Sequence, residues 1–115
     1  WEAAMFGAYH HVDNVVAIVD YNKIQLDGFV KDILDLEPLV DKWKSFGWHV
    51  IDVDGHSIPA LQKAFAEASA TKGKPTAIIA QTIKGKGVSF MENNPKYHGV
   101  APTADECTKA LQELA

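Results

Sequence analysis

An unbroken apolar run, Val15-Val16-Ala17-Ile18-Val19, stops abruptly at the polar cluster Asp20-Tyr21-Asn22. A run rich in β-branched residues, without polar alternation, is typical of a strand that is buried on both faces of a parallel sheet. In open parallel sheets, ligands bind outside the carboxyl ends of the strands. Asn22 therefore occupies a position where a binding residue is expected.

The chemistry of this position allows two interpretations. The side-chain oxygen of Asn22 is a neutral, hard ligand suited to Mg²⁺ or Ca²⁺, and the carbonyl two residues on, at Ile24, can share the ion if the loop turns back. The alternative is a simple turn, because Asp, Asn and Gly form turns for local reasons. Spacing alone favours the turn and leaves the metal site open.

The remaining pattern alternates strands with helices. Strands are predicted at residues 14–20, 48–53 and 76–82, and residues 28–36 are expected to be irregular. Helices are predicted at residues 1–12 and 38–46, after the N-cap Ser57, and from Asp105 to Leu114. Such an alternation builds right-handed crossovers into a parallel sheet with helices on both sides. The sequence thus predicts an α/β fold, a three-layer sandwich with a mostly parallel sheet that is incomplete at its N-terminus.

A second polar segment follows the third predicted strand. Ile83-Lys84-Gly85-Lys86-Gly87-Val88 combines positive charge with glycines that let the backbone approach a ligand. It is not a nucleotide P-loop, because the order strand–GxxxxGK[ST]–helix is absent. Alone it also fits a basic surface loop. Two polar loops at strand ends of one parallel sheet favour a ligand site, since both converge on one edge. His56, in a third such turn, is interpreted as structural.

Composition limits the classes of function. With 115 residues, 47% of them hydrophobic and 23% charged, the chain fits one soluble globular domain without a second domain. The net charge of -4 argues against nucleic-acid binding, and no apolar run reaches the roughly 20 residues of a membrane helix. The chain has no Arg, so phosphate must be held by Lys, His, backbone amides or a metal ion. The single Cys107 fits a cytoplasmic location, and we expect it in the core.

Two stretches together resemble the transketolase family. Asp20-Tyr21-Asn22-Lys23-Ile24-Gln25-Leu26-Asp27-Gly28, preceded by Trp1-Glu2-Ala3-Ala4, resembles the second half of the family's thiamine-diphosphate motif. The stretch from Thr82 to Asn93, followed by Tyr97-His98-Gly99, resembles a loop of bacterial transketolases, particularly those split into amino-terminal and carboxy-terminal subunits. The Gly-Asp-Gly that opens the family motif is missing, and the chain is expected to begin just after it.

The resemblance implies a role for each matched residue. Asn22 and the backbone carbonyl of Ile24 would bind Mg²⁺ (or Ca²⁺), and Leu26 would contact a ring of thiamine diphosphate. Lys84 and His98 would face the diphosphate, and His98 would also approach the reacting centre. Glu2 would join an acidic network that links the two active sites of a dimer.

The resemblance also implies the reaction of the complete protein. It would transfer a two-carbon ketol unit from a ketose phosphate to an aldose phosphate, as in the pentose phosphate pathway. A pyrimidine-binding domain or subunit would be its partner, in a homodimer or a heterotetramer. Without that partner and the Gly-Asp-Gly, we expect the isolated chain to be inactive. Two alternatives are a deoxyxylulose-phosphate-synthase-like thiamine enzyme and a non-catalytic α/β interaction module.

Overall fold

The computed structural model describes all 115 residues. They form two compact units: residues 1–21 and 36–81 make the first, and residues 22–35 and 82–115 make the second. The chain leaves the first unit after Tyr21, returns at Leu36 and leaves again after Gln81. Each unit therefore combines two stretches that are separate in the sequence.

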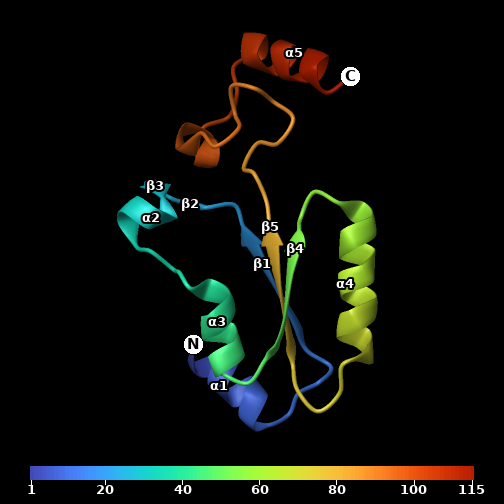
Figure 1. Cartoon of the computed structure of the whole chain (residues 1–115). Coiled ribbons are helices and arrows are strands. Elements are labelled where there is room, and N and C mark those ends of the chain that lie inside the picture. The colour runs from blue at the N-terminus through green and yellow to red at the C-terminus, as the bar shows by residue number, and fades with distance from the viewer. The chain divides into compact units, whose positions relative to one another are not determined.

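The first unit is built on a three-stranded sheet with the order β1-β5-β4 (Figure 1). Both pairings of the central strand are parallel. Tyr21 and Asp54 both pair with Gln81, so the three strands end at the same edge of the sheet. The strands are β1 (Val16–Tyr21), β4 (His49–Asp54) and β5 (Thr76–Gln81).

Helices cover both faces of this sheet, which confirms the predicted three-layer arrangement. Figure 1 shows α1 and α3 on one side of the sheet and α4 on the other. Their bounds are α1 (Glu2–Tyr9), α3 (Leu39–Ser45) and α4 (Ile58–Ala70). Ser57 caps α4 as predicted, because its hydroxyl accepts from the Ala60 amide at 3.4 Å.

Side chains of β5 divide the core between the two helical layers. Ala77 and Ile79 lie in clusters with residues of α1 and α3, whereas Ile78 packs with Ala64 and Ala68 of α4. Ala77, Ile78 and Ile79 are each 0% exposed. The alternation follows from the period of two along a strand. β5 is therefore the strand that is buried on both faces.

An aromatic cluster lies on the side of the sheet that carries α1 and α3. The Trp43 ring makes edge contacts with Trp1 and Trp48, at centroid distances of 5.6 and 4.8 Å. The buried Trp48 Nε1 donates to the Ala4 carbonyl at 2.8 Å. The Trp43 Nε1 is also buried but finds no acceptor.

Glu37 links the end of β1 to the start of α3. Its carboxylate accepts from the Tyr21 hydroxyl at 2.6 Å and from the Leu39 amide at 2.9 Å. The N-cap position itself is Pro38, which has no side-chain acceptor to offer. Glu37 thus supplies the cap and anchors the last residue of β1.

The second unit holds a hairpin and the C-terminal segment. The hairpin is antiparallel, and a short helix follows it. Its elements are β2 (Ile24–Gln25), β3 (Gly28–Phe29), α2 (Val30–Ile33), the 3-10 helix η1 (Pro95–His98) and α5 (Ala104–Glu113). No helix of either unit is long and apolar enough to cross a membrane.

Three local expectations were wrong. β1 is not buried on both faces, because Val16 and Ile18 are 41% and 56% exposed. The residues of α4 pack instead against β5 and β4. Residues 28–36 are not irregular throughout, since they contain β3 and α2. Cys107 is exposed rather than in the core.

Because β5 is buried, shortening one of its side chains should destabilise the protein more than shortening an exposed side chain. We expect Ile78→Ala to lower the free energy of unfolding by about 2–5 kcal/mol, because it leaves a cavity under α4. Ile58→Ala is the matched control, since Ile58 is 65% exposed, and we expect a much smaller loss. Urea denaturation of both variants measures the difference. Equal losses would contradict the described core.

Candidate functional site

The chain turns back on itself directly after β1. Asn22 Oδ1 accepts from the Ile24 amide at 2.9 Å, and Lys23 adopts a left-handed φ of 65°. The Lys23 carbonyl then accepts from the Val30 amide at 2.8 Å, which closes the hairpin that follows. The turn that spacing favoured is therefore present.

The donor set of this turn fits a hard cation. The side-chain oxygen of Asn22 accepts a hydrogen bond from the Ile24 amide, and the oxygen of an amide is a neutral, hard ligand. No group of three or more His, Cys, Asp or Glu side chains in the chain could hold a metal ion. Mg²⁺ keeps octahedral geometry and is commonly bound by few protein oxygens together with substrate phosphates. Asn22 and the Ile24 carbonyl match such a partial, neutral ligand set.

Leu26 lies at the tip of the hairpin between β2 and β3. Its side chain is 65% exposed, although it is large and apolar. The neighbouring Gln25 side chain is occupied with the Leu34 carbonyl, at 3.5 Å. An exposed leucine on a short hairpin is suited to contact an apolar ring.

The segment from Lys84 to Glu92 folds onto itself. The Lys84 carbonyl accepts from the Asn93 amide at 3.0 Å, and the Glu92 carboxylate accepts from the Gly87 amide at 3.0 Å. Gly85 has a φ of 72°, and a Cβ there would lie 2.6 Å from the Met91 carbonyl oxygen. Gly85 is therefore required by the packing of the loop itself.

His98 ends η1, and its side chain is exposed. Its ring forms no hydrogen bond or ion pair within the chain. The preceding residue is anchored, because the Tyr97 hydroxyl donates to Glu106 Oε1 at 2.7 Å. That carboxylate raises the pKa of Tyr97. The pKa of Glu106 is lowered, first by the hydrogen bond from the Thr103 amide and then by the Tyr97 hydroxyl.

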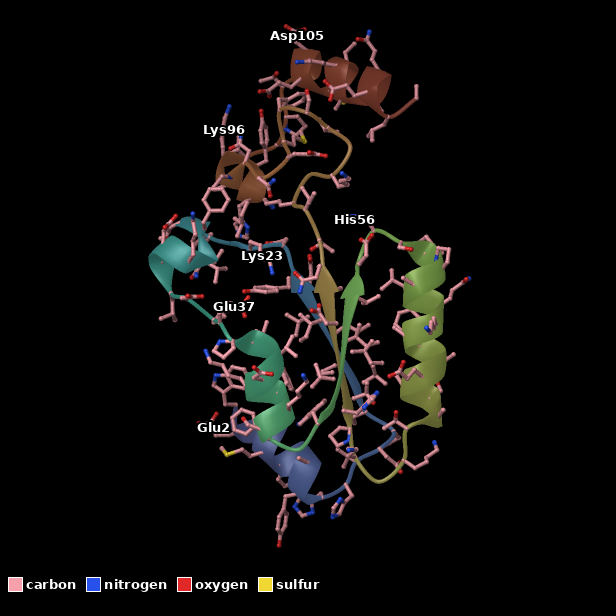
Figure 2. All side chains as sticks on the ribbon, viewed as in Figure 1. Glu2, Lys23, Glu37, His56, Lys96 and Asp105 are labelled. Atoms are coloured by element: carbon pink, nitrogen blue, oxygen red, sulfur yellow. The ribbon has the colours of Figure 1, made fainter.

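The predicted residues fall into both units. Asn22, Ile24, Leu26, Lys84 and His98 all belong to the second unit. Glu2 belongs to the first unit, at the exposed start of α1 (Figure 2). Its pKa is lowered, first by its own backbone amide.

Two further carboxylates interact with the loop and were missed by sequence reasoning. Glu106 and Glu113, both on α5, accept hydrogen bonds from Tyr97 and Ser89. A signal for one of them exists, since Thr103 and Glu106 have the spacing of a capping box and form one. In the turn with His56, Asp54 Oδ1 accepts from the His56 amide at 2.9 Å.

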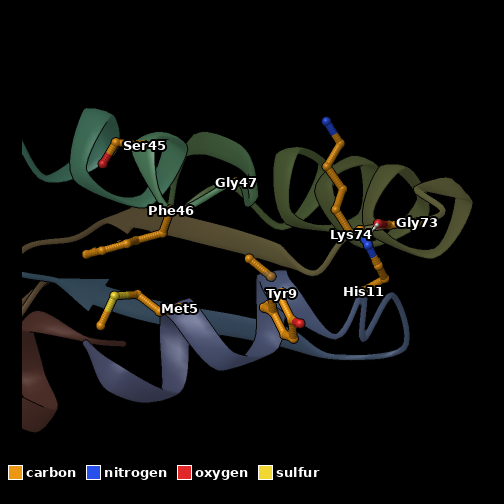
Figure 3. Close-up of a pocket in the computed structure, with 9 residues that line it drawn as sticks. Met5, Tyr9, His11, Ser45, Phe46, Gly47, Gly73 and Lys74 are labelled. Atoms are coloured by element: carbon orange, nitrogen blue, oxygen red, sulfur yellow. Dashed lines mark hydrogen bonds between the residues drawn. The ribbon is translucent and has the colours of Figure 1, made fainter.

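An open cavity of about 630 Å³ lies in the first unit, between the end of α1 and the segments that enter β4 and β5 (Figure 3). Figure 3 shows His11 and Tyr9 on one wall and Phe46 on another. The lining residues Gly47 and Lys74 precede β4 and β5, so the cavity is at the edge where the strands begin. None of the predicted site residues lines it.

Comparison with protein families shows which family the chain belongs to. The family described as "Transketolase, thiamine diphosphate binding domain" matches residues 1–115. The chain belongs to the transketolase family. The match covers both the Asn22 turn and the Lys84 loop, so the residues that carried the resemblance lie in the matching domain.

Similar proteins include transketolase subunits. The chain is 45% identical over 114 residues to a 6-deoxy-6-sulfo-D-fructose transketolase subunit of Clostridium sp. (strain MSTE9), covering 99% of the chain and 42% of that protein. It is 38% identical over 115 residues to an apulose-4-phosphate transketolase subunit of Phocaeicola vulgatus, covering 100% of the chain and 41% of that protein. The chain thus spans about two fifths of the length of these relatives.

Solved transketolases share the fold. The structure from Campylobacter jejuni superposes with a TM-score of 0.90 at 29% identity, over 97% of this chain and 17% of that one. The structure from Leishmania mexicana gives a TM-score of 0.87 at 32% identity, over 95% and 16% of the two chains. The α/β arrangement described above is therefore that of known transketolases.

The glycines of the chain predict a graded series of stabilities. Gly73→Ala should cost about 1–2 kcal/mol, because Gly73 has a φ of 76° but open space around it. Gly85→Ala should cost more, since it adds the clash with Met91 to the same backbone strain. Gly99→Ala should be nearly neutral, having neither problem. Thermal unfolding of the three variants tests the order, and equal losses at Gly73 and Gly85 would contradict it.

Proposed function

We propose that residues 1–115 form the C-terminal part of a thiamine-diphosphate-binding domain, and that the complete protein is a transketolase. It would transfer a two-carbon ketol unit from a ketose phosphate to an aldose phosphate. The observation that carries the proposal is the match of the transketolase thiamine-diphosphate domain over the whole chain. The Asn22 turn supports it, because that turn offers a hard-cation ligand set.

In this proposal the chain holds the cofactor by its charged end. The amide oxygen of Asn22 and the carbonyl of Ile24 bind Mg²⁺, or Ca²⁺ in its place. Lys84 and His98 offset diphosphate charge in a chain that has no Arg. When bound, thiamine diphosphate supplies the carbon nucleophile for ketol transfer. Leu26 packs against a cofactor ring.

His98 is the proposed catalytic residue of the chain. An exposed imidazole without a partner in the chain is free to donate a hydrogen bond to negative charge that develops on a substrate oxygen. Glu2 is proposed to act across a dimer, in an acidic network between two sites. Its exposure at the start of α1 supports this role, because the carboxylate is accessible to a second subunit.

The partner is proposed to be a pyrimidine-binding transketolase domain or subunit, in a homodimer or heterotetramer. Relatives that are named as subunits support a separate partner chain. The relatives' names specify two different sugars, 6-deoxy-6-sulfo-D-fructose and apulose 4-phosphate, so the proposal names no single donor sugar. Both sugars and fructose 6-phosphate form the donor panel that we would assay. The cytoplasmic location stays a prediction.

The alternatives make different predictions for that assay. A deoxyxylulose-phosphate-synthase-like enzyme would use pyruvate, and the transketolase names of the relatives argue against it. A non-catalytic module would turn over no donor and would bind no cofactor. Assaying the complete protein with pyruvate and with the donor panel separates all three functions.

Asn22→Ala tests the metal half of the site. In the complete protein we expect it to weaken thiamine diphosphate binding about tenfold or more when Mg²⁺ is present, since metal affinity is sensitive to the ligand set. Without Mg²⁺ the variant and the original protein should bind alike. Titration calorimetry measures both conditions.

Asn14→Ala is the matched control, because Asn14 is an exposed asparagine in the turn before β1. Its binding of thiamine diphosphate should not change. Binding by Asn22→Ala that equals the control in the presence of Mg²⁺ would contradict the assignment of Asn22 as a ligand.

A further inference from the structure

α5 contacts the loop that runs from residue 83 to residue 99 at two places. Glu113 Oε1 accepts from the Ser89 hydroxyl at 2.8 Å, and Glu106 Oε1 accepts from the Tyr97 hydroxyl at 2.7 Å. The two glutamates are seven residues apart, which is about two helical turns, so they lie on one face of α5. This face therefore binds the loop both near its glycine turn and directly before His98.

Packing between the loop and α5 supports these hydrogen bonds. The rings of Phe90 and Tyr97 meet edge to face at a centroid distance of 5.8 Å. The Lys109 Nζ of α5 lies 5.2 Å from the centroid of the Phe90 ring. Loop and helix thus form one packed substructure within the second unit.

Glu106 has a geometry that holds Tyr97 firmly. Its Oε2 accepts from the Thr103 amide at 2.8 Å, so the carboxylate is fixed to the first turn of α5. Its Oε1 is then directed at the Tyr97 hydroxyl, and Lys96 Nζ lies 3.9 Å away. Both oxygens are used, and they connect the start of α5 to η1.

His98 itself has no comparable support. Its ring has no hydrogen-bond partner within the chain, and its side chain is exposed. The position of the imidazole therefore depends on the backbone of η1, where the neighbouring Tyr97 is the residue bonded to α5. A change at the Tyr97 hydroxyl would reach His98 through one peptide unit.

We propose that Glu106 is a positioning residue, which acts through the Tyr97 hydroxyl to fix the place of His98. The inference rests on the proposed function only in the role that it gives to His98. Neither Glu106 nor Tyr97 touches the substrate in this account. They hold η1 in the one conformation that places the His98 imidazole for its proposed catalytic role.

The experiment uses the complete protein and the variant Tyr97→Phe, which removes the hydroxyl but leaves the ring and the α5 cap intact. Tyr9→Phe is the matched control, because Tyr9 is 78% exposed and its hydroxyl has no partner. The first measurement is amide hydrogen exchange of residues 96–99 without cofactor. We expect faster exchange in Tyr97→Phe and in Glu106→Gln, and no change in Tyr9→Phe. Unchanged exchange in the first two variants would overturn the inference.

The second measurement is kcat for ketol transfer from the donor of the panel that supports turnover. We expect Tyr97→Phe to lower kcat about tenfold, because it removes the hydrogen bond to the Glu106 carboxylate that restricts η1. In a His98→Ala background, the same substitution should have no further effect. A purely structural role would lower kcat equally in both backgrounds, and that result would overturn the inference.

The outcomes also separate this inference from the proposed function. If His98→Ala retains full kcat, the role of His98 in the proposed function is wrong, and the inference falls with it. If His98→Ala is impaired but Tyr97→Phe is not, only the positioning role is wrong. If no donor is turned over, the proposed function is wrong, and the exchange measurement alone decides whether Glu106 fixes η1.

Discussion

The two-sided parallel pairing of β5 is the constraint on which the first unit depends. Residues 76–81 hydrogen-bond to a strand on each side and are covered by helices on each face. A backbone buried in this way has no water to satisfy its polar groups, so the ladders must form together. The register that results places Tyr21 and Gln81 side by side. Both stretches of the second unit leave the sheet from these two positions.

The main elements were predictable because their signals are local and strong. Runs such as Thr76-Ala77-Ile78-Ile79 are too apolar for a loop. Ser57 indicates the start of a helix, because serine is a preferred N-cap residue. The hairpin of β2 and β3 was not predictable, since strands of two residues contain no detectable period. The exposure of Val16 and Ile18 could not be seen either, because it depends on where α4 lies over the sheet.

The candidate site was inferred from a different signal. Asn22, Lys84 and His98 are proposed from their resemblance to family motifs, whereas spacing alone favoured an ordinary turn and a basic loop. The bond from Tyr97 to Glu106 was beyond the sequence, because it joins residues nine positions apart through the packing of α5. Gly85 has a further requirement that the sequence did not reveal, since a Cβ there would meet the Met91 carbonyl.

The distribution of aromatic residues makes the two units optically distinct. Trp1, Trp43 and Trp48 are the three tryptophans of the chain, and all belong to the first unit. The second unit has no tryptophan, and Tyr97 is its one tyrosine. Tryptophan emission from this chain therefore reports on the sheet and its α1–α3 face. The phenol of Tyr97, bonded to a carboxylate, reports on the loop that carries His98 once the signals of Tyr9 and Tyr21 are removed by substitution.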